Sequence, residues 1–170
     1  DCPSGHYFSS FVARRDDPRD DPADYADAVL AYNEAVSQSG WAAPQAWAAE
    51  RGFRFAAVSC TGAHIEAARA VAEARADIAA IDALSLRLIL RHESWADGLR
   101  SIGRTAATPA PPYITAAARD PAPIRAALRD GLASLSPADR DTLGITGLTE
   151  IAPGDYHAVP NPAPPASELV

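Results

Sequence analysis

The feature that most constrains this 170-residue sequence is an amphipathic segment followed by a short run without polar residues. Across residues 65–73, apolar side chains recur every three to four positions and charged side chains occupy the opposite face, which predicts a helix. Residues 78–81 are then continuously apolar between Asp77 and Asp82, as in strands whose sheet is covered on both faces. We therefore expect a buried sheet with helices packed on it.

The same alternation of apolar runs and helical patterns extends along the chain. We expect strands at residues 7–13, 28–33, 53–60 and 77–82, a further strand from residue 99, and helices at residues 41–50, 65–73 and 84–91. Pro121 begins another predicted helix, and Ser136 precedes a last short one. The former carries an apolar stripe of Ile124, Leu128, Leu132 and Leu135. This order predicts an α/β fold with a mixed, mostly parallel sheet and helices on both faces.

Composition excludes several classes of protein. The net charge of −7 argues against a non-specific nucleic-acid binder, which presents a basic face to phosphates. No apolar run approaches the ~20 residues of a membrane-spanning helix. The four histidines lack the spacing of metal ligands, so we expect neither a metal site nor a cofactor. Cys2 and Cys60 form either one disulfide or two separate thiols.

Polar residues follow three of the predicted strands, at the point where each strand ends. In open parallel sheets, ligands bind at the carboxyl ends of the strands, where the next helices begin. The three polar clusters are residues 33–40, residues 61–64 and Asp82. Their convergence at one edge of the sheet is the main functional signal in the sequence.

The first cluster suits an anion. Ser37 and Ser39 precede a helix, where their hydroxyls can donate hydrogen bonds, and Gly40 lets a ligand approach the backbone amides. The alternative for Ser39 is a purely structural helix N-cap, a role that serine fills commonly.

His64 and Asp82 also have two interpretations each. His64 stands at the start of a predicted helix, where its imidazole can donate to an oxyanion, or it is a partly buried histidine with a structural role. Asp82 holds a cationic group or a neighbouring donor, or it caps the helix that begins at Leu84.

In this order, the segments resemble a known family. The matching residues are Asn33, Ser37-x-Ser39-Gly40, Thr61-Gly62-x-His64, residues 76–82, Leu99-Arg100-x-Ile102, Thr105, Thr108-Pro109 and Pro112-Tyr113-Ile114-Thr115. Over about residues 7–156, the chain resembles the phosphate/phosphite/phosphonate-type substrate-binding proteins of bacterial ABC importers, in the type 2 periplasmic binding protein superfamily. The resemblance begins part-way through the family pattern, so we expect an N-terminal part to be missing from this chain.

The resemblance implies a two-lobed clamp that holds its ligand between the lobes. Residues 1–105 would form a hinge strand and the second lobe, residues 106–159 a return segment that completes the first lobe, and residues 160–170 a flexible tail. The implied ligand-binding residues are Ser37, Gln38, Ser39, Gly40, His64 and Asp82. Without the missing part, the apolar stripe that begins at Ile124 would lack part of its packing surface.

The chain departs from the family pattern at three positions. Ala67, Ala74 and Leu86 stand where a serine, a glycine and an aromatic residue are common. The two alanines are expected to be compatible with a helix, whereas Leu86 is expected to alter the pocket wall. The organic part of the ligand is therefore left open.

The implied function is capture of a small oxyanion, such as a phosphonate, phosphite or phosphate-like anion, by the solute-binding component of an ABC importer. Such a protein is not an enzyme, uses no cofactor and works in the periplasm or another extracytoplasmic space. Its partners are the anionic ligand and a transporter permease, and not nucleic acid. It meets the membrane only through the permease or through a lipid anchor outside this sequence.

Two other functions remain as alternatives. Ser37 or Ser39, His64 and Asp82 could act as nucleophile, base and orienting acid of a hydrolase, although the sequence has no G-x-S-x-G motif. The lobe could also be a sensor that works without a transporter. A hydrolase would consume an ester, whereas a receptor would only be stabilised by its ligand.

Overall fold

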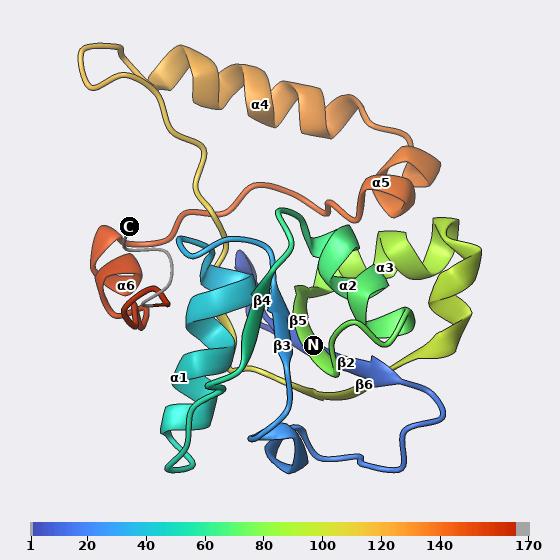
Figure 1. Cartoon of the computed structure of the whole chain (residues 1–170). Helices are drawn as coiled ribbons and strands as arrows, with labels where there is room; N and C mark the ends of the chain where they lie inside the picture. The colour runs from blue at the N-terminus through green and yellow to red at the C-terminus, as the bar shows by residue number, and fades with distance from the viewer. Residues whose placement is uncertain (1, 166–170) are drawn as a thin grey trace.

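The computed structural model describes residues 2–165 and contains one five-stranded sheet (Figure 1). In spatial order, the strands are β4 (Val58–Cys60), β3 (Leu30–Tyr32), β5 (Ile78–Asp82), β2 (Ser9–Arg14) and β6 (Leu99–Arg104). β3 pairs in parallel with β4 and β5, whereas β2 is antiparallel to β5 and β6. Because β2 alone runs against the other four strands of this sheet, the predicted mixed, mostly parallel sheet is confirmed.

Helices connect these strands and continue beyond them. The α-helices are α1 (Ala43–Ala49), α2 (His64–Ala72), α3 (Ala83–His92), α4 (Ala122–Ser134), α5 (Pro137–Leu143) and α6 (Pro153–His157). Shorter helical turns are η1 (Pro22–Tyr25), η2 (Gln38–Ala42) and η3 (Ser94–Gly98). A separate antiparallel pair joins β1 (His6–Tyr7) to β7 (Thr108–Pro109). All five helices predicted from the sequence are present, whereas η1, η3 and α6 were not predicted.

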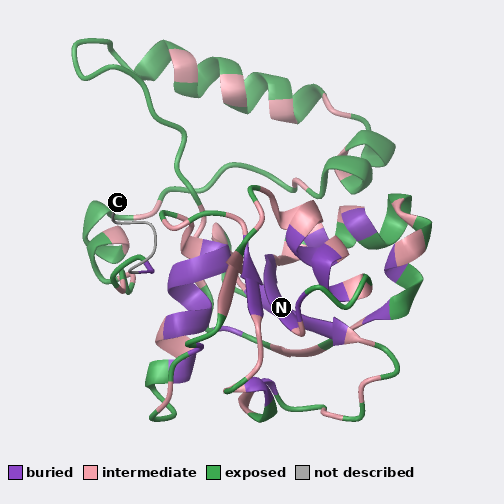
Figure 2. Cartoon of the chain, viewed as in Figure 1, coloured by how far each residue is buried: buried purple, intermediate pink, exposed green. Residues whose placement is uncertain are grey.

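Alternate residues of the central strands enter two separate cores, one on each face of the sheet. In β5, Ala79 and Ile81 pack with residues of α2 and α3, while Ile78 and Ala80 pack with residues of η1 and α1. β2 and β3 divide their side chains in the same way. Figure 2 shows the buried centre between these helices. The continuous apolar run of β5 is therefore explained by burial on both faces, as predicted.

One predicted strand is much shorter than expected. The sequence predicts a strand over residues 53–60, but only Val58–Cys60 pair with β3. Phe55 is fully buried, and the side chain of Gln45 bonds both its backbone groups: Gln45 Nε2 donates to the Phe55 carbonyl at 3.0 Å, and the Phe55 amide donates to Gln45 Oε1 at 3.2 Å. A glutamine amide from α1 thus replaces the pairing that a neighbouring strand would give.

The turn after α2 also differs from its expected conformation. The helix ends at Ala72, and Ala74 has a φ of 58°, in the left-handed region that disfavours side chains with a β-carbon. The prediction of a helix-compatible Ala74 is therefore wrong. A glycine would meet this turn without strain, because it lacks the β-carbon.

Helices α4 to α6 lie outside the two cores. None of the residues of α4, all of which the structure describes, is buried, and its apolar stripe is half-exposed (Figures 1 and 2). Within the predicted tail, Ala163 accepts a hydrogen bond from the indole of Trp41 at 3.1 Å, while residues 166–170 lie outside the described part of the chain. No helix within residues 2–165 is long and apolar enough to span a membrane.

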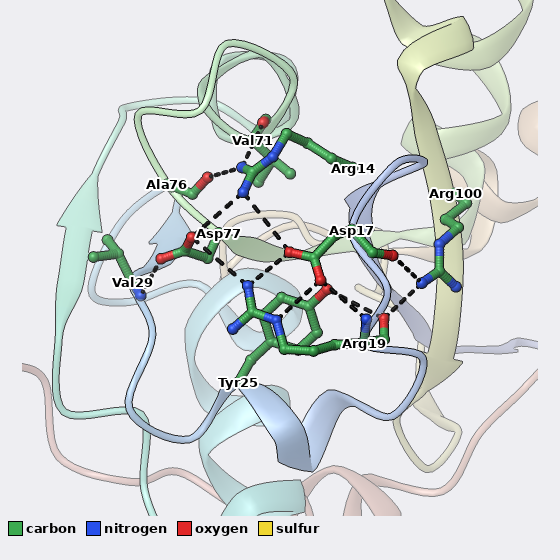
Figure 3. A network of polar contacts seen from close by, with 9 residues as sticks. All are labelled: Arg14, Asp17, Arg19, Tyr25, Val29, Val71, Ala76, Asp77 and Arg100. Carbon is green, nitrogen blue, oxygen red and sulfur yellow. Dashed lines mark hydrogen bonds and ion pairs between the residues drawn. The ribbon is translucent and has the colours of Figure 1, made fainter.

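A network of charged side chains lies where β2 ends and β5 begins (Figure 3). Asp17 accepts hydrogen bonds from Arg19 Nε at 3.0 Å and Nη2 at 2.7 Å. Asp77 lies 3.5 Å from Arg14 and accepts from the backbone amide of Val29 at 2.9 Å. The hydrogen bonds from Arg19 hold the pKa of Asp17 far below its ordinary value. These contacts join the loop after β2 to the first residues of β3 and β5.

Candidate functional site

The polar residues at the ends of β3, β4 and β5 meet in the structure. Ser39 in η2 follows β3, His64 begins α2 after β4, and Asp82 ends β5. Ser39 Oγ lies 2.9 Å from His64 Nε2, and Asp82 Oδ2 lies 3.6 Å from the same nitrogen. The predicted convergence of the three strand ends is confirmed, while the ligand-binding roles of these residues stay a prediction.

Ser37 organises the turn that carries Ser39. Its backbone is extended, its Oγ accepts a hydrogen bond from the Gly40 amide at 3.0 Å, and its carbonyl accepts from the Trp41 and Ala42 amides at 3.2 and 3.0 Å. Ser37 is therefore the N-cap of η2, and the alternative that Ser39 is only a cap is wrong. The Ser39 hydroxyl is left to face His64, with the Ser37 hydroxyl 3.5 Å away.

Side chains from β1 and from the first residue of β2 support this turn by hydrogen bonds. Tyr7 donates its phenol hydrogen to Gln38 Oε1 at 2.5 Å, and Ser9 Oγ donates to the Ser39 carbonyl at 2.8 Å. Thr105, at the end of β6, accepts a hydrogen bond from the Ser9 amide at 3.0 Å. Burial is the main cause that raises the pKa of Tyr7. Neither Tyr7 nor Ser9 is predicted from the sequence as a site residue, because a strand pattern does not indicate contacts with residues about 30 positions away.

His64 is held mostly away from water. Its side chain is 16% exposed, and this burial lowers the pKa of its imidazole, against the opposing influence of Asp82 and Glu34. Its Nε2 faces Ser39 and Asp82, whereas its Nδ1 is buried without a hydrogen-bond partner. The lowered pKa favours the neutral form of the imidazole.

Asp82 both caps α3 and faces His64, which are the two roles expected from its position. Its Oδ1 accepts hydrogen bonds from the Leu84 and Ser85 amides at 3.1 and 3.0 Å and so caps α3, which begins one residue earlier than expected. Its Oδ2 faces His64. The cap therefore fixes the carboxylate that orients the imidazole.

Gly40 is required by the packing around it. A β-carbon at this position would overlap Asn33 Oδ1 and lie 3.3 Å from His64 Cε1. The absence of a side chain thus lets η2 approach both the end of β3 and the start of α2. The backbone of η2 is brought against the imidazole as a result.

The cluster offers hydroxyl, amide and imidazole donors rather than arginine. Within residues 2–165, no arginine forms a hydrogen bond or an ion pair with Ser39, His64 or Asp82. Grouped His, Cys, Asp and Glu side chains that would suit a metal ion do not occur within residues 2–165. Leu86 packs in the core with Val12 and Leu99. The arrangement can therefore hold a small anion by neutral donors, assisted by one titratable ring.

Comparison with known proteins gives one family and several similar structures. The model of the family described as "ABC transporter, phosphonate, periplasmic substrate-binding protein" matches residues 3–158. No curated protein matches significantly in sequence. XAC2383 from Xanthomonas citri, solved bound to chloride ion and bound to ATP, superposes with a TM-score of 0.64 at 20% identity, covering 91% of this chain and 63% of that one.

Two further structures are similar over a shorter part of the chain. A binding protein component of an ABC phosphonate transporter, PA3383 from Pseudomonas aeruginosa, has a TM-score of 0.53 and 22% identity over 62% of this chain and 38% of that chain. PhnD1 from Prochlorococcus marinus (MIT 9301), in complex with methylphosphonate, has a TM-score of 0.54 and 14% identity over 61% and 43%. This chain therefore spans less than two-thirds of the length of each.

These structural likenesses establish the fold, and the family match covers most of the chain. The chain belongs to the family of phosphonate substrate-binding proteins of ABC transporters, which are periplasmic binding proteins.

Proposed function

We propose that this chain forms the ligand-binding part of a receptor that captures a small oxyanion for an ABC importer. The observation that carries the proposal is the contact of Ser39 and Asp82 with one nitrogen of His64, at the ends of three parallel strands. The proposed ligand-binding residues are Ser37, Gln38, Ser39, Gly40, His64 and Asp82.

The chemistry of these groups suits an anion. Two serine hydroxyls lie close to one imidazole, which begins α2, a helix whose first-turn amides have no side-chain cap. An anion bound beside His64 favours the protonated ring, and Asp82, 3.6 Å from Nε2, also stabilises that positive charge. The protein would thus add a positive charge beside the anion only when the ligand is present.

The related structures support an anionic ligand. PhnD1 is in complex with methylphosphonate, and XAC2383 was found with chloride and with ATP. PA3383 is described as a component of an ABC phosphonate transporter. Because the family consists of periplasmic substrate-binding proteins of ABC transporters, the receptor would work in an extracytoplasmic space, with a permease as its partner. Residues 1–105 would supply one lobe, with residues 106–159 returning to the other and residues 160–170 following as a tail.

The geometry disfavours the hydrolase alternative. In a Ser-His-Asp triad, the acid bonds one ring nitrogen and the serine bonds the other. Here Ser39 and Asp82 both face Nε2, while Nδ1 has no partner. Asp82 could not hold the imidazole in the tautomer that activates Ser39, so we infer that the chain is not an enzyme.

The test is a binding titration with a built-in structural control. The 170-residue chain is titrated calorimetrically with methylphosphonate, phosphite, phosphate and sulfate, and its melting temperature is followed with each anion. Gly40→Ala should weaken binding, because the new β-carbon displaces the Asn33 side chain and lies 3.3 Å from His64 Cε1. Gly98→Ala, where a β-carbon meets nothing within 4 Å, should bind like the parent.

Two results would contradict the proposal. One is that none of the four anions binds or raises the melting temperature of the parent chain. The other is hydrolysis of p-nitrophenyl acetate that disappears in Ser39→Ala. A sensor without a transporter would bind the same anions, and neighbouring genes for a permease and an ATPase would distinguish the two roles.

A further inference from the structure

Two residues that lie against Gly40, Asn33 and His64, each have one buried polar atom without a partner. Among the described residues, Asn33 Oδ1 and His64 Nδ1 are the buried side-chain nitrogen and oxygen atoms that form no hydrogen bond. A β-carbon at Gly40 would overlap Asn33 Oδ1 and lie 3.3 Å from His64 Cε1, the ring carbon bonded to Nδ1. The unpartnered oxygen and the ring carbon between the two nitrogens of His64 therefore lie near the same α-carbon.

The contacts of the imidazole determine which nitrogen carries its hydrogen. Asp82 Oδ2 is a carboxylate oxygen and can only accept, and it lies 3.6 Å from Nε2. We assign the hydrogen of the neutral ring to Nε2, where it faces Asp82 Oδ2 and Ser39 Oγ, a hydroxyl oxygen that can accept it at 2.9 Å. This assignment leaves a lone pair on Nδ1. In that state Asn33 Oδ1 and His64 Nδ1 are both acceptors, and neither can satisfy the other.

A second proton on the ring removes this conflict. Protonation of Nδ1 by solvent turns that nitrogen into a donor, while Nε2–H continues to face Ser39 and Asp82. Asn33 Oδ1, which also lies against Gly40 and has no partner, can accept this hydrogen once its side chain turns toward the ring. One proton taken from water thus satisfies two buried groups that the neutral state leaves unpaired.

We propose that Asn33 is a positioning residue for His64, whose side-chain oxygen accepts the Nδ1 hydrogen of the imidazolium when an oxyanion is bound. The ligand-bound part of this statement rests on the function proposed above. Asn33 would then select the doubly protonated ring, without touching the anion itself.

The surroundings of His64 explain why the second proton depends on the ligand. The charged groups that act on the ring are Asp82 at the end of β5 and Glu34 after β3, and the phenol of Tyr7 in β1 faces the same cluster. The effect of burial outweighs that of the two carboxylates and lowers the pKa of the His64 imidazole. The negative charge of a bound anion adds to theirs and favours protonation.

The backbone holds Asn33 in register with His64. The Asn33 carbonyl accepts the Gly62 amide at 2.9 Å, and the Tyr32 carbonyl accepts the Thr61 amide at 2.9 Å. The loop that these bonds fix leads directly into α2 and His64. The amide oxygen and the ring are therefore placed by one set of contacts.

The experiment follows the ring nitrogens of His64 by nuclear magnetic resonance, in the full chain labelled with nitrogen-15 in histidine. The His64→Gln spectrum assigns the signals. In the parent without ligand, we expect the neutral ring to carry hydrogen on Nε2. Asn33→Ala should lower the titration midpoint of His64 by about one pH unit, because a hydrogen bond to the charged ring is lost. Asn33→Asp should raise it by a similar amount.

Asn161→Ala is the matched control, because Asn161 is exposed in the C-terminal segment, and it should leave the midpoint unchanged. An Nδ1–H tautomer in the neutral parent would overturn the proposal, as would an unchanged midpoint in Asn33→Ala. If Asn33→Ala does not fold, Asn33→Asp decides alone: a midpoint that does not rise overturns the proposal.

A second measurement separates this proposal from the proposed function. Calorimetry with methylphosphonate in two buffers of different ionisation enthalpy should show more proton uptake in the parent than in Asn33→Ala. If methylphosphonate, phosphite, phosphate and sulfate all fail to bind, the proposed function fails, while the ligand-free titration still decides whether Asn33 acts on His64. Equal uptake by the two proteins would overturn the ligand-bound role of Asn33.

Discussion

The two ends of β2 and β5 carry polar clusters of opposite character. At one end, the network of Arg14, Asp17, Arg19 and Asp77 pairs acids with guanidinium groups (Figure 3). At the other end, the cluster around His64 contains both of the buried polar atoms that lack partners among the described residues. Both ends belong to the same strands, so the strands themselves do not account for the difference.

The difference separates stability from binding. Buried polar groups are almost always paired, because an unpaired one loses its hydrogen bonds to water without replacement. The arginine network follows this rule and fixes the loop after β2. The cluster around His64 departs from it, and a bound anion with one extra proton would restore the pairing. We therefore expect variants of the network to change stability, and variants of the cluster to change binding.

The largest effect is expected from Asp17→Asn. The side chain of Asp17 is 7% exposed and accepts two hydrogen bonds from Arg19, so its neutralisation leaves the Arg19 guanidinium with only Asp77, at 3.9 Å, as a counter-charge. We expect the free energy of unfolding to fall by about 3 kcal/mol, measured by urea denaturation. Asp16→Asn, at the exposed neighbouring position, should change it by less than about 0.5 kcal/mol.

The pH dependence of unfolding gives an independent check on the same residue. The pKa of Asp17 is depressed in the folded chain, so its contribution is complete above the ordinary carboxyl pKa of about 4 and is lost as pH falls below it. Asp17→Asn should flatten the profile in that acid range. If Asp17→Asn is as stable as Asp16→Asn, or if it weakens anion binding as Ser39→Ala does, the comparison between the two ends is broken.

Ser39→Ala should have the second-largest effect, on binding rather than folding. The Ser39 hydroxyl faces His64 and the proposed anion, so its loss should weaken binding by about 2 kcal/mol in calorimetric titration with methylphosphonate. The urea midpoint should change little. Ser59→Ala, in β4 and away from the cluster, serves as the control. Equal affinities for the two variants would remove Ser39 from the site.

Ala74→Gly should sharpen the comparison by stabilising the network end of the molecule. Ala74 has a φ of 58° in the turn that leads to Asp77, and glycine adopts this conformation without steric cost. After allowing for the greater freedom of glycine in the unfolded chain, we expect a gain of about 0.5–1 kcal/mol and unchanged binding. Ala72→Gly, at the last residue of α2, should instead destabilise the chain, because alanine favours the helical conformation there. A loss of stability in Ala74→Gly would contradict the strained turn.

The smallest effect is expected from His64, on the stability of the chain near neutral pH when no ligand is added. Burial lowers the pKa of His64 in the folded state, so the unfolded chain binds a proton at this position first as pH falls below about 6.5. The free energy of unfolding should decrease in that range, and His64→Gln should remove this decrease. If His64→Gln retains the same slope, the titration belongs to another group.

Several features of the fold and the site follow from local sequence. The continuous apolar run of β5 predicts burial on both faces, and the amphipathic pattern of α2 predicts a helix, because both depend on side-chain periodicity along a short segment. The meeting of Ser39, His64 and Asp82 also follows, since parallel strands end at one edge of a sheet.

Other features depend on contacts between distant segments. The sequence predicts a strand at Phe55, but Gln45 bonds its backbone instead, and no local pattern shows that an amide from α1 will reach it. It also leaves open whether Ser39 is only an N-cap, a role that Ser37 takes in the structure. Tyr7 and Ser9 enter the site only through the packing of β1 and β2 against η2.

By itself, the sequence determined the alternation of strands and helices, the two-faced sheet and the edge at which polar residues gather, because hydrophobic periodicity acts on each segment separately. Tertiary structure alone decided which nitrogen of His64 faces Asp82, which buried oxygen stays unpaired beside it, and which acids the arginines neutralise. Hydrogen bonds require the donor–acceptor distance to be right within a few tenths of an ångström and the donor to point at the acceptor. Only the packed chain fixes both.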